Sequence, residues 1–302
     1  MNAPLVVLGA TASGKSDVAM AFARHHPGTE LVAVDAMQVY RGMDIGTAKP
    51  SAADRTAVPH HCIDLVDPSH DFTVAEFVAT ARSTVRTITA RGVRPVLVAG
   101  TGLYLRAVID PIDIPGAWPD VRAELERRVQ SEGSAALHAE LVGLDPTAAA
   151  RIEPKNARRV VRALEVTLGG GRPFSSYGPG LDHYPPTDVV QVGLRWPRDV
   201  LGARIADRVR RMVAAGLVAE VEGLLARPGG MSRTARQALG YRELIDHLQG
   251  RCSLDEAIDL TVLRTRQFAV RQERWFRRDP RIRWVDIEHD PVAEVLPVLE
   301  TS

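Results

Sequence analysis

The 302-residue chain has few cysteines, few lysines and no long hydrophobic run. Its two cysteines, Cys62 and Cys252, are far apart, which excludes a disulfide framework and a four-cysteine zinc site. No apolar run reaches the ~18 residues of a membrane span, and the N-terminus lacks the charged and apolar regions of a secretory signal. We therefore expect a cytoplasmic protein that is not bound to a membrane.

Lysine is rare even though basic residues are common. The chain has 38 basic against 37 acidic residues, but the only lysines are Lys15, Lys49 and Lys155. In a chain so rich in arginine, a lysine can mark a place where a guanidinium does not fit. Codon bias is the alternative, which we favour for Lys155. The residues around Lys15 argue for a function.

The order of predicted elements indicates an α/β sheet interrupted by a helical segment. Strands alternate with amphipathic helices at both ends of the chain, which predicts a parallel sheet flanked by helices with right-handed crossovers. Between them, residues 113–186 show helical spacing and no convincing strand. We expect a core domain of residues 1–112 and 187–302 and an all-helical insertion of residues 113–186. Strands are predicted at residues 4–8, 31–34, 96–99, 189–194 and 283–287, and helices at 16–24, 74–91, 200–226 and 253–278.

A phosphate-binding loop (P-loop) follows the first predicted strand. Residues 9–16 match the pattern G-x-x-x-x-G-K-[ST] and open a predicted helix. Backbone N–H groups of such a loop and the helix N-terminus attract phosphate. The alternative is a glycine-rich turn with an exposed lysine. A kinase, an NTPase and a prenyltransferase all remain possible. The predicted phosphate ligands are Gly9, Ala10, Thr11, Ala12, Ser13, Gly14, Lys15 and Ser16, with Ser16 also facing Mg²⁺.

Asp35 follows the second predicted strand. Ligands of open parallel sheets bind at the carboxyl ends of the strands, so Asp35 and the phosphate loop can face one cavity. At this stage three roles stay open for the carboxylate. It can bind Mg²⁺ through water, accept a proton from a nucleophile, or cap a turn.

Longer sequence blocks resemble the tRNA dimethylallyltransferase family (tRNA isopentenyltransferase) of bacterial type. The most specific is the sixteen-residue stretch 35–50, DAMQVYRGMDIGTAKP. The chain departs from the usual family pattern at Ala10, Ala36, Ala99 and Arg158, and it has no paired-cysteine zinc finger near its C-terminus, unlike eukaryotic members. The other matching blocks are residues 9–16, 59–64, 99–104, 158–166, 237–243 and 266–277.

The resemblance implies a chemistry. Members transfer a dimethylallyl group from dimethylallyl diphosphate to the adenosine just 3′ of the anticodon in tRNA, with Mg²⁺ near Ser16. It implies that Asp35 is the base, that Thr101 orients the amine, and that Arg204 or Arg208 contacts the diphosphate. We also expect a monomer and an ATP-binding loop. The implied tRNA-binding residues are Asp35, Ala36, Met37, Gln38, Thr101, Arg122, Arg158, Arg159, Val160, Val161 and Arg162.

Two further segments carry chemically active side chains. Residues 264–283 contain eight arginines with only Glu273 and Asp279, which favours a basic surface for an RNA backbone. We interpret the aromatic residues of this segment as core, and base stacking is the alternative. The adjacent His60, His61 and Cys62 lack further metal ligands nearby, so we expect structural roles for them.

Overall fold

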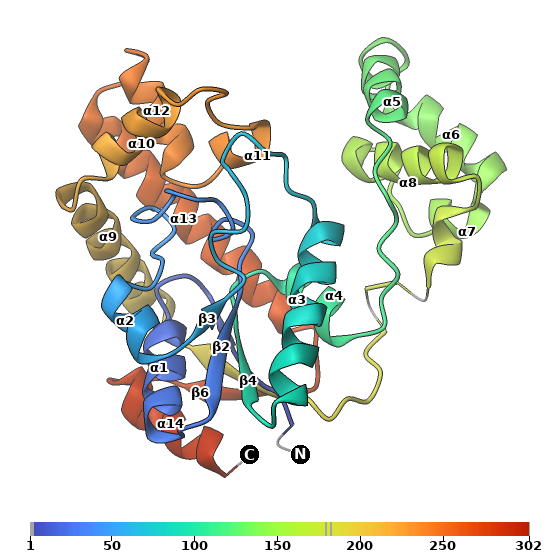
Figure 1. Cartoon of the computed structure of the whole chain (residues 1–302). Helices are drawn as coiled ribbons and strands as arrows, with labels where there is room; N and C mark the ends of the chain where they lie inside the picture. The colour runs from blue at the N-terminus through green and yellow to red at the C-terminus, as the bar shows by residue number, and fades with distance from the viewer. Residues whose placement is uncertain (1–2, 179, 182, 302) are drawn as a thin grey trace. The chain divides into compact units, whose positions relative to one another are not determined.

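The computed structural model describes residues 3–178, 180–181 and 183–301. It divides into two compact units, unit 1 of residues 1–109 with 186–302 and unit 2 of residues 110–185 (Figure 1). The domain ranges expected from the sequence differ from these units by a few residues. They also include residues 1, 2, 179, 182 and 302, which lie outside the described residues.

Unit 1 is built on a six-stranded parallel sheet with the strand order β3-β2-β4-β1-β5-β6. Strand β1 pairs on both sides, so Leu5 lies opposite Val96 and also opposite Val190. The predicted parallel α/β fold is confirmed, although the two-residue strand β3 was not expected. The strands are β1 (Leu5–Gly9), β2 (Thr29–Val34), β3 (His60–His61), β4 (Arg94–Ala99), β5 (Val190–Arg195) and β6 (Ile282–Asp286).

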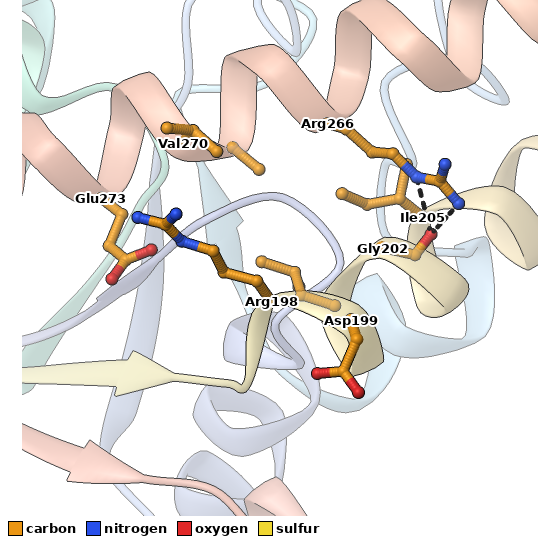
Figure 2. A pocket seen from close by; sticks show the side chains of 9 residues that line it. Arg198, Asp199, Gly202, Ile205, Arg266, Val270 and Glu273 are labelled. Atoms are coloured by element: carbon orange, nitrogen blue, oxygen red, sulfur yellow. Dashed lines mark hydrogen bonds between the residues drawn. The ribbon is translucent and has the colours of Figure 1, made fainter.

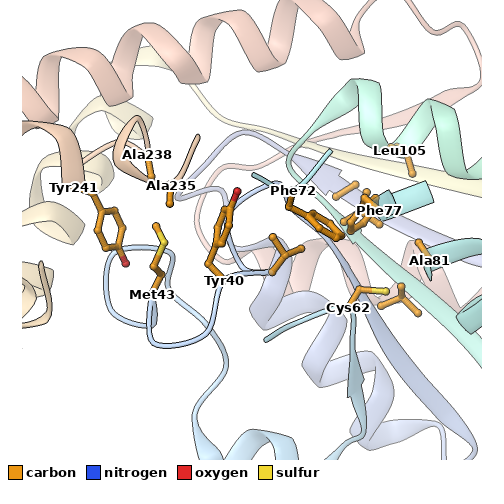
Figure 3. Packing of buried hydrophobic residues seen from close by; sticks show 14 of the residues in the cluster. Tyr40, Met43, Cys62, Phe72, Phe77, Ala81, Leu105, Ala235, Ala238 and Tyr241 are labelled. Carbon is orange, nitrogen blue, oxygen red and sulfur yellow. The ribbon is translucent and has the colours of Figure 1, made fainter. Parts of the chain in front are cut away.

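Both faces of the sheet are covered by helices. Leu5 and Val7 belong to one buried cluster, and Val6 and Leu8 to the other, because successive side chains of a strand point to opposite faces. The first cluster also contains residues of α1 (Lys15–His25) and α14 (Pro291–Glu300). The second contains residues of α3 (Val74–Ala90), α10 (Leu217–Leu225) and α12 (Tyr241–Leu248), and part of it is drawn in Figure 3. Such burial on both faces explains why strands β1, β2 and β4 contain continuous apolar runs.

The predicted helix over residues 200–226 is wrong, because the structure has two helices there. Helix α9 ends at Ala214 and α10 begins at Leu217. Gly216 between them has φ 101°, a left-handed conformation that glycine adopts without steric cost. The helices of unit 1 are α1 (Lys15–His25), α2 (Ala52–Ala57), α3 (Val74–Ala90), α4 (Gly102–Ile109), α9 (Arg198–Ala214), α10 (Leu217–Leu225), α11 (Arg233–Arg236), α12 (Tyr241–Leu248), α13 (Leu254–Phe276) and α14 (Pro291–Glu300).

Unit 2 consists of helices, and its described residues contain no strand. Apolar residues three or four apart on α5, α6 and α8 form its core, with Leu125, Leu137, Leu141 and Leu164 at most 1% exposed. None of the described helices in either unit is long and apolar enough to span a bilayer. The helical elements of unit 2 are α5 (Pro119–Glu132), α6 (Ser134–Leu144), α7 (Pro146–Ala149), α8 (Ala157–Gly170) and the 3₁₀ turn η1 (Phe174–Tyr177).

Candidate active site

The phosphate loop joins the centre of the sheet to α1. Ala12 has φ 63° and Gly14 has φ 91°, so the backbone turns sharply before the first helical residue, Lys15. The Ser13 N–H donates to the Ala10 carbonyl (3.3 Å). This curled backbone and the N-terminus of α1 give the partial positive charge that a phosphate group requires.

Lys15 is the charged side chain of the loop. Its Nζ lies 3.4 Å from the carbonyl oxygen of Ala10. Burial, together with the nearby charge of Arg208, lowers the pKa of Lys15 to about 8, while Asp35 and Asp17 act in the opposite direction. The ammonium group is therefore short of counter-charge, and an anion at the loop would stabilise it.

Asp35 stands one residue beyond the end of β2. Its Oδ1 accepts hydrogen bonds from the backbone N–H groups of Met37 (2.8 Å) and Gln38 (3.2 Å). One oxygen of the carboxylate thus caps the turn, which was one of the three roles left open by the sequence. The second oxygen, Oδ2, points elsewhere, toward the end of β4.

Gly100, directly after β4, is the point at which these groups meet. A Cβ atom placed on Gly100 would lie 3.5 Å from Lys15 Cε, 3.6 Å from Asp35 Oδ2 and 3.4 Å from Gln272 Nε2. The ends of β1, β2 and β4 therefore bring the lysine and the carboxylate to one place, next to Thr101. A side chain at this position would fill the space between them.

Gln272 on α13 is a site residue that sequence reasoning missed. It is only 7% exposed. Its Oε1 accepts the N–H of Thr11 (3.0 Å), and its Nε2 donates to the carbonyl of Gly100 (2.6 Å). Gln272 therefore connects the phosphate loop to the end of β4. The signal available was its position inside the matching block 266–277.

The two arginines expected near the diphosphate have different surroundings. The Nε of Arg204 donates to the carbonyl of Ala12 (2.9 Å), and its guanidinium lies over the ring of Trp196. The indole N–H of Trp196 in turn donates to the carbonyl of Ser13 (2.9 Å). Arg204 thus supports the backbone of the loop. Arg208 lies close enough to Lys15 to lower its pKa, and burial lowers the pKa of Arg208 itself.

The segment after Asp35 is held by contacts from distant parts of unit 1. Glu220 of α10 accepts the backbone N–H groups of Asp44 (2.9 Å) and Ile45 (2.7 Å). Lys49, whose side chain is 1% exposed, donates to Asp64 Oδ1 (2.5 Å) and so has a structural role. The Nε2 of Gln38 donates to the carbonyl of Thr47 (3.0 Å). The sequence motif around Asp35 is therefore a closed loop with a fixed shape.

The predicted RNA-binding residues of unit 2 fall into three groups. Arg158 and Arg159 are exposed near the start of α8. Val160 and Val161 are 0% and 3% exposed in the core, so the expectation that they contact tRNA is corrected for their side chains. The third group, Arg122 and Arg162, is ion-paired with the buried carboxylate of Glu165.

The aromatic residues of segment 264–283 and the histidines at 60 and 61 have structural contacts. Phe276 is buried, and Trp275 and Trp284 pack against the same cluster, which agrees with the core interpretation. His61 pairs with Glu30 (2.7 Å), and His60 contacts the carbonyl of Val58. Among the described residues, no three His, Cys, Asp or Glu side chains are placed to hold a metal ion.

A separate cavity of about 320 Å³ lies between α9 and α13 (Figure 2). Apolar residues of both helices and the charged residues Arg198, Asp199, Arg266 and Glu273 line it. The Nε and Nη2 of Arg266 both donate hydrogen bonds to the carbonyl of Gly202. Neither the phosphate loop nor Asp35 is among its lining residues, so this cavity is not the site at Gly100.

Sequence comparison finds family models and relatives that are similar to this chain. A family model described as IPP transferase matches residues 38–279, and one described as isopentenyl transferase matches residues 2–60. A tRNA dimethylallyltransferase from Kineococcus radiotolerans is 52% identical, over 100% of this chain and 99% of the relative.

Solved structures are similar over nearly the whole chain. The tRNA isopentenylpyrophosphate transferase of Bacillus halodurans is 39% identical with a TM-score of 0.70, and the match covers 100% of this chain and 96% of that one. A eukaryotic dimethylallyltransferase described as acting on tRNA is 25% identical with a TM-score of 0.76, covering 95% and 74% of the two chains.

Proposed function

The chain belongs to the IPP transferase family, and from this premise we propose that it transfers a dimethylallyl group from dimethylallyl diphosphate to N6 of the adenosine 3′-adjacent to the anticodon in tRNA. The allylic C–O bond breaks and its electron pair leaves with diphosphate. A bond forms between the allylic carbon and N6, and the amine loses one proton. The enzyme is a prenyltransferase.

One observation carries this proposal. Lys15 Cε and Asp35 Oδ2 both lie within 3.6 Å of the position that a Cβ atom would occupy on Gly100. A phosphate-binding cation and a carboxylate that are this close can act on the two halves of one reaction. The leaving group needs the cation, and the nucleophile needs the carboxylate.

The phosphate loop would hold the diphosphate as a leaving group. Negative charge grows on the diphosphate as the C–O bond breaks, and fixed donors aimed at it lower the barrier. Lys15 and Arg208 would supply the positive charge. Burial lowers the pKa of both groups, so an anionic diphosphate would stabilise both cations. Arg204 acts by supporting the loop, since its Nε is bonded to the carbonyl of Ala12. Nucleotides such as ATP would compete for the same loop.

Asp35 would accept the proton of the adenine amine. Because Oδ1 is held by two backbone N–H groups, Oδ2 is left for the substrate. Thr101, next to Gly100, would orient the amine, and Gln38 would contact an edge of the base. The adenosine must leave its stack to reach these groups.

Mg²⁺ fits this site only as a partner of the diphosphate. No cage of three acidic or metal-binding side chains exists among the described residues, and Mg²⁺ commonly takes few protein ligands and several phosphate and water oxygens. Ser16, exposed at the start of α1, would provide a hydroxyl ligand. The ion would neutralise charge on the leaving diphosphate.

Unit 2 would bind the anticodon stem-loop through its arginines. Arg158 and Arg159 are exposed, and Arg122 and Arg162 are half-exposed. Arginine pairs well with phosphate oxygens, which supports contact with the RNA backbone. We also propose that the enzyme works as a monomer in the cytoplasm, where thiols such as those of Cys62 and Cys252 stay reduced.

Labelled dimethylallyl diphosphate and an anticodon stem-loop RNA test the proposal. We expect the label to pass to RNA with release of one diphosphate per transfer. An otherwise identical RNA with guanosine in place of the target adenosine is the matched control and should stay unlabelled. A parallel reaction contains labelled ATP. Phosphoryl transfer from ATP without any prenylation would refute the proposal and indicate a kinase.

A further inference from the structure

Glu165 of α8 is a buried carboxylate without a role in the proposed reaction. Its side chain is 0% exposed in unit 2. Its Oε1 accepts the backbone N–H of Trp118 (3.0 Å) and pairs with Arg162 Nη1 (3.0 Å). Its Oε2 accepts no hydrogen bond and lies 3.6 Å from Arg122 Nη1. A buried charge is costly, so its partners must be held firmly.

The two arginines around Glu165 come from different helices. Arg122 is on α5 and Arg162 is on α8, and their side chains are 42% and 30% exposed. Each guanidinium therefore has one side facing the buried carboxylate and part of its surface open to solvent, and the Nε of Arg122 also donates to Glu126 (2.9 Å). Arg162 is fixed further by its bond to the carbonyl of Pro115 (2.9 Å).

The same carboxylate fixes where α5 begins. Trp118, the residue before α5, donates its N–H to Glu165. Its ring packs on two glycines of α8, since a Cβ on Gly169 would lie 2.3 Å from Trp118 Cγ and a Cβ on Gly170 would lie 3.1 Å from its Cη2. Glu165 thus sets the spacing between Arg122 and Arg162.

We propose that Glu165 is a positioning residue for RNA binding, which presents Arg122 and Arg162 together to phosphate groups of the tRNA backbone. This inference rests on the proposed function. Arginine forms a rigid planar fork, and holding one side of the fork directs the remaining N–H groups outward. A flexible arginine would lose side-chain entropy on binding RNA, and a fixed one has lost it already.

Glu165→Gln tests the proposal because glutamine keeps the shape and the acceptor for the Trp118 N–H. The change removes a negative charge, so electrostatics alone would tighten RNA binding. We expect the opposite, an increase of about tenfold in the Kd and the KM for tRNA at 50 mM salt, because two charge-assisted phosphate contacts weaken. The kcat and the KM for dimethylallyl diphosphate should not change.

Salt dependence gives a readout that loosening of the core would not produce. Two lost phosphate contacts make the slope of log K against log salt shallower by about 1.4 to 1.8. The tenfold deficit should therefore shrink to less than about twofold at 200 mM salt. A deficit that stays constant with salt would overturn the proposal.

The matched control is Glu126→Gln. Glu126 also pairs with Arg122 (2.9 Å) but is 42% exposed, and this change should leave the Kd for tRNA within about twofold of wild type. In a mutant cycle, Glu165→Gln should add little to the combined Arg122→Gln and Arg162→Gln changes, because it acts through those two arginines. Additive losses, or tighter RNA binding by Glu165→Gln, would overturn the proposal.

Stability is followed by thermal unfolding, and a variant that is folded at the assay temperature is compared by Kd. If Glu165→Gln does not fold, Arg162→Lys tests the same idea, since a lysine keeps the charge but cannot bond Glu165 and Pro115 as a fork. We expect it to weaken tRNA binding, and unchanged binding would contradict the proposal. The proposed function fails separately, if the wild-type enzyme does not prenylate RNA.

Discussion

Asp35→Asn is the sharpest test of the reaction centre. Asparagine has nearly the same shape, and its carbonyl oxygen can still accept the N–H groups of Met37 and Gln38 that Asp35 Oδ1 accepts now. The amide NH₂ then replaces Oδ2 next to Gly100. The turn is preserved, and the group that would accept the proton is lost.

The size of the effect follows from the role. A positioned general base contributes about 10²- to 10⁴-fold to the rate. We therefore expect single-turnover prenylation to slow by this factor, or by about 3 to 5 kcal/mol in activation free energy. The Kd for tRNA should stay within about threefold, because a positioned base contributes to the rate and not to ground-state binding.

Two further variants separate the base from other roles of the carboxylate. Asp17→Asn removes another charge that raises the pKa of Lys15 but leaves the base, so prenylation assayed at pH 6.5, where Lys15 stays protonated, should change little. Asp35→Ala also removes the acceptor for two backbone N–H groups and should lower the free energy of unfolding by about 1 to 3 kcal/mol, which Asp35→Asn should not do. A single-turnover rate for Asp35→Asn within threefold of wild type would refute the assignment.

Four other predictions concern Lys15, Gln272 and the arginines of unit 2. Because the pKa of Lys15 is about 8, its ammonium form is lost above that pH. The kcat/KM for dimethylallyl diphosphate should therefore fall as pH rises through 8, and a flat profile between pH 7 and 9 would contradict a role for this cation. The unfolded lysine keeps its proton up to its ordinary pKa of 10.5, so the free energy of unfolding should rise with pH between 8 and 10.5, as denaturant titrations would show. Gln272→Met leaves the Thr11 N–H and the Gly100 carbonyl without their hydrogen-bond partners, which costs about 1 to 3 kcal/mol of stability for each. This variant should raise the KM for dimethylallyl diphosphate while the Kd for tRNA stays unchanged. Equal losses of affinity for both substrates would contradict a role at the loop. Reversing the charge of Arg158 and Arg159 together should weaken tRNA binding and make the slope of log K against log salt shallower by at least about 1.4. The control is Arg127→Glu, which changes an exposed arginine on α5. Equal slopes for the two variants would contradict a role of Arg158 and Arg159 in RNA binding.

Local signals in the sequence were sufficient for five of the six strands and for the position of the phosphate loop. The apolar runs at residues 4–8, 31–34 and 96–99 became β1, β2 and β4, because a strand buried on both faces is apolar over most of its length. Strands β5 and β6 were also predicted, although β6 is a partly exposed edge strand. The capping box of Ser253 and Glu256 marks the start of α13, and the reciprocal hydrogen bonds are present. These features depend on neighbours within a few residues, so the sequence contains them directly.

Features that depend on distant partners were missed. Gln272 bonds Thr11 across 261 positions, and Glu220 bonds Asp44 across 176, which no local pattern indicates. The break at Gly216 was missed because the apolar spacing on both sides fits one helix, and only the backbone angle shows the end. Glu165 was recognised only as a member of the matching block 158–166. Its burial was missed because the burial of a carboxylate depends on how α5 and α8 pack.

The hydrogen bond between Thr11 and Gln272 also bears on synthesis of the chain. The phosphate loop is among the first segments to be translated, but its partners Trp196, Arg204 and Gln272 come much later. A nascent chain that ends before α13 lacks the side chain that fixes Thr11. We therefore expect the complete loop to form only when translation is nearly finished, and shortened products to bind the proposed isoprenoid donor more weakly than the full chain does.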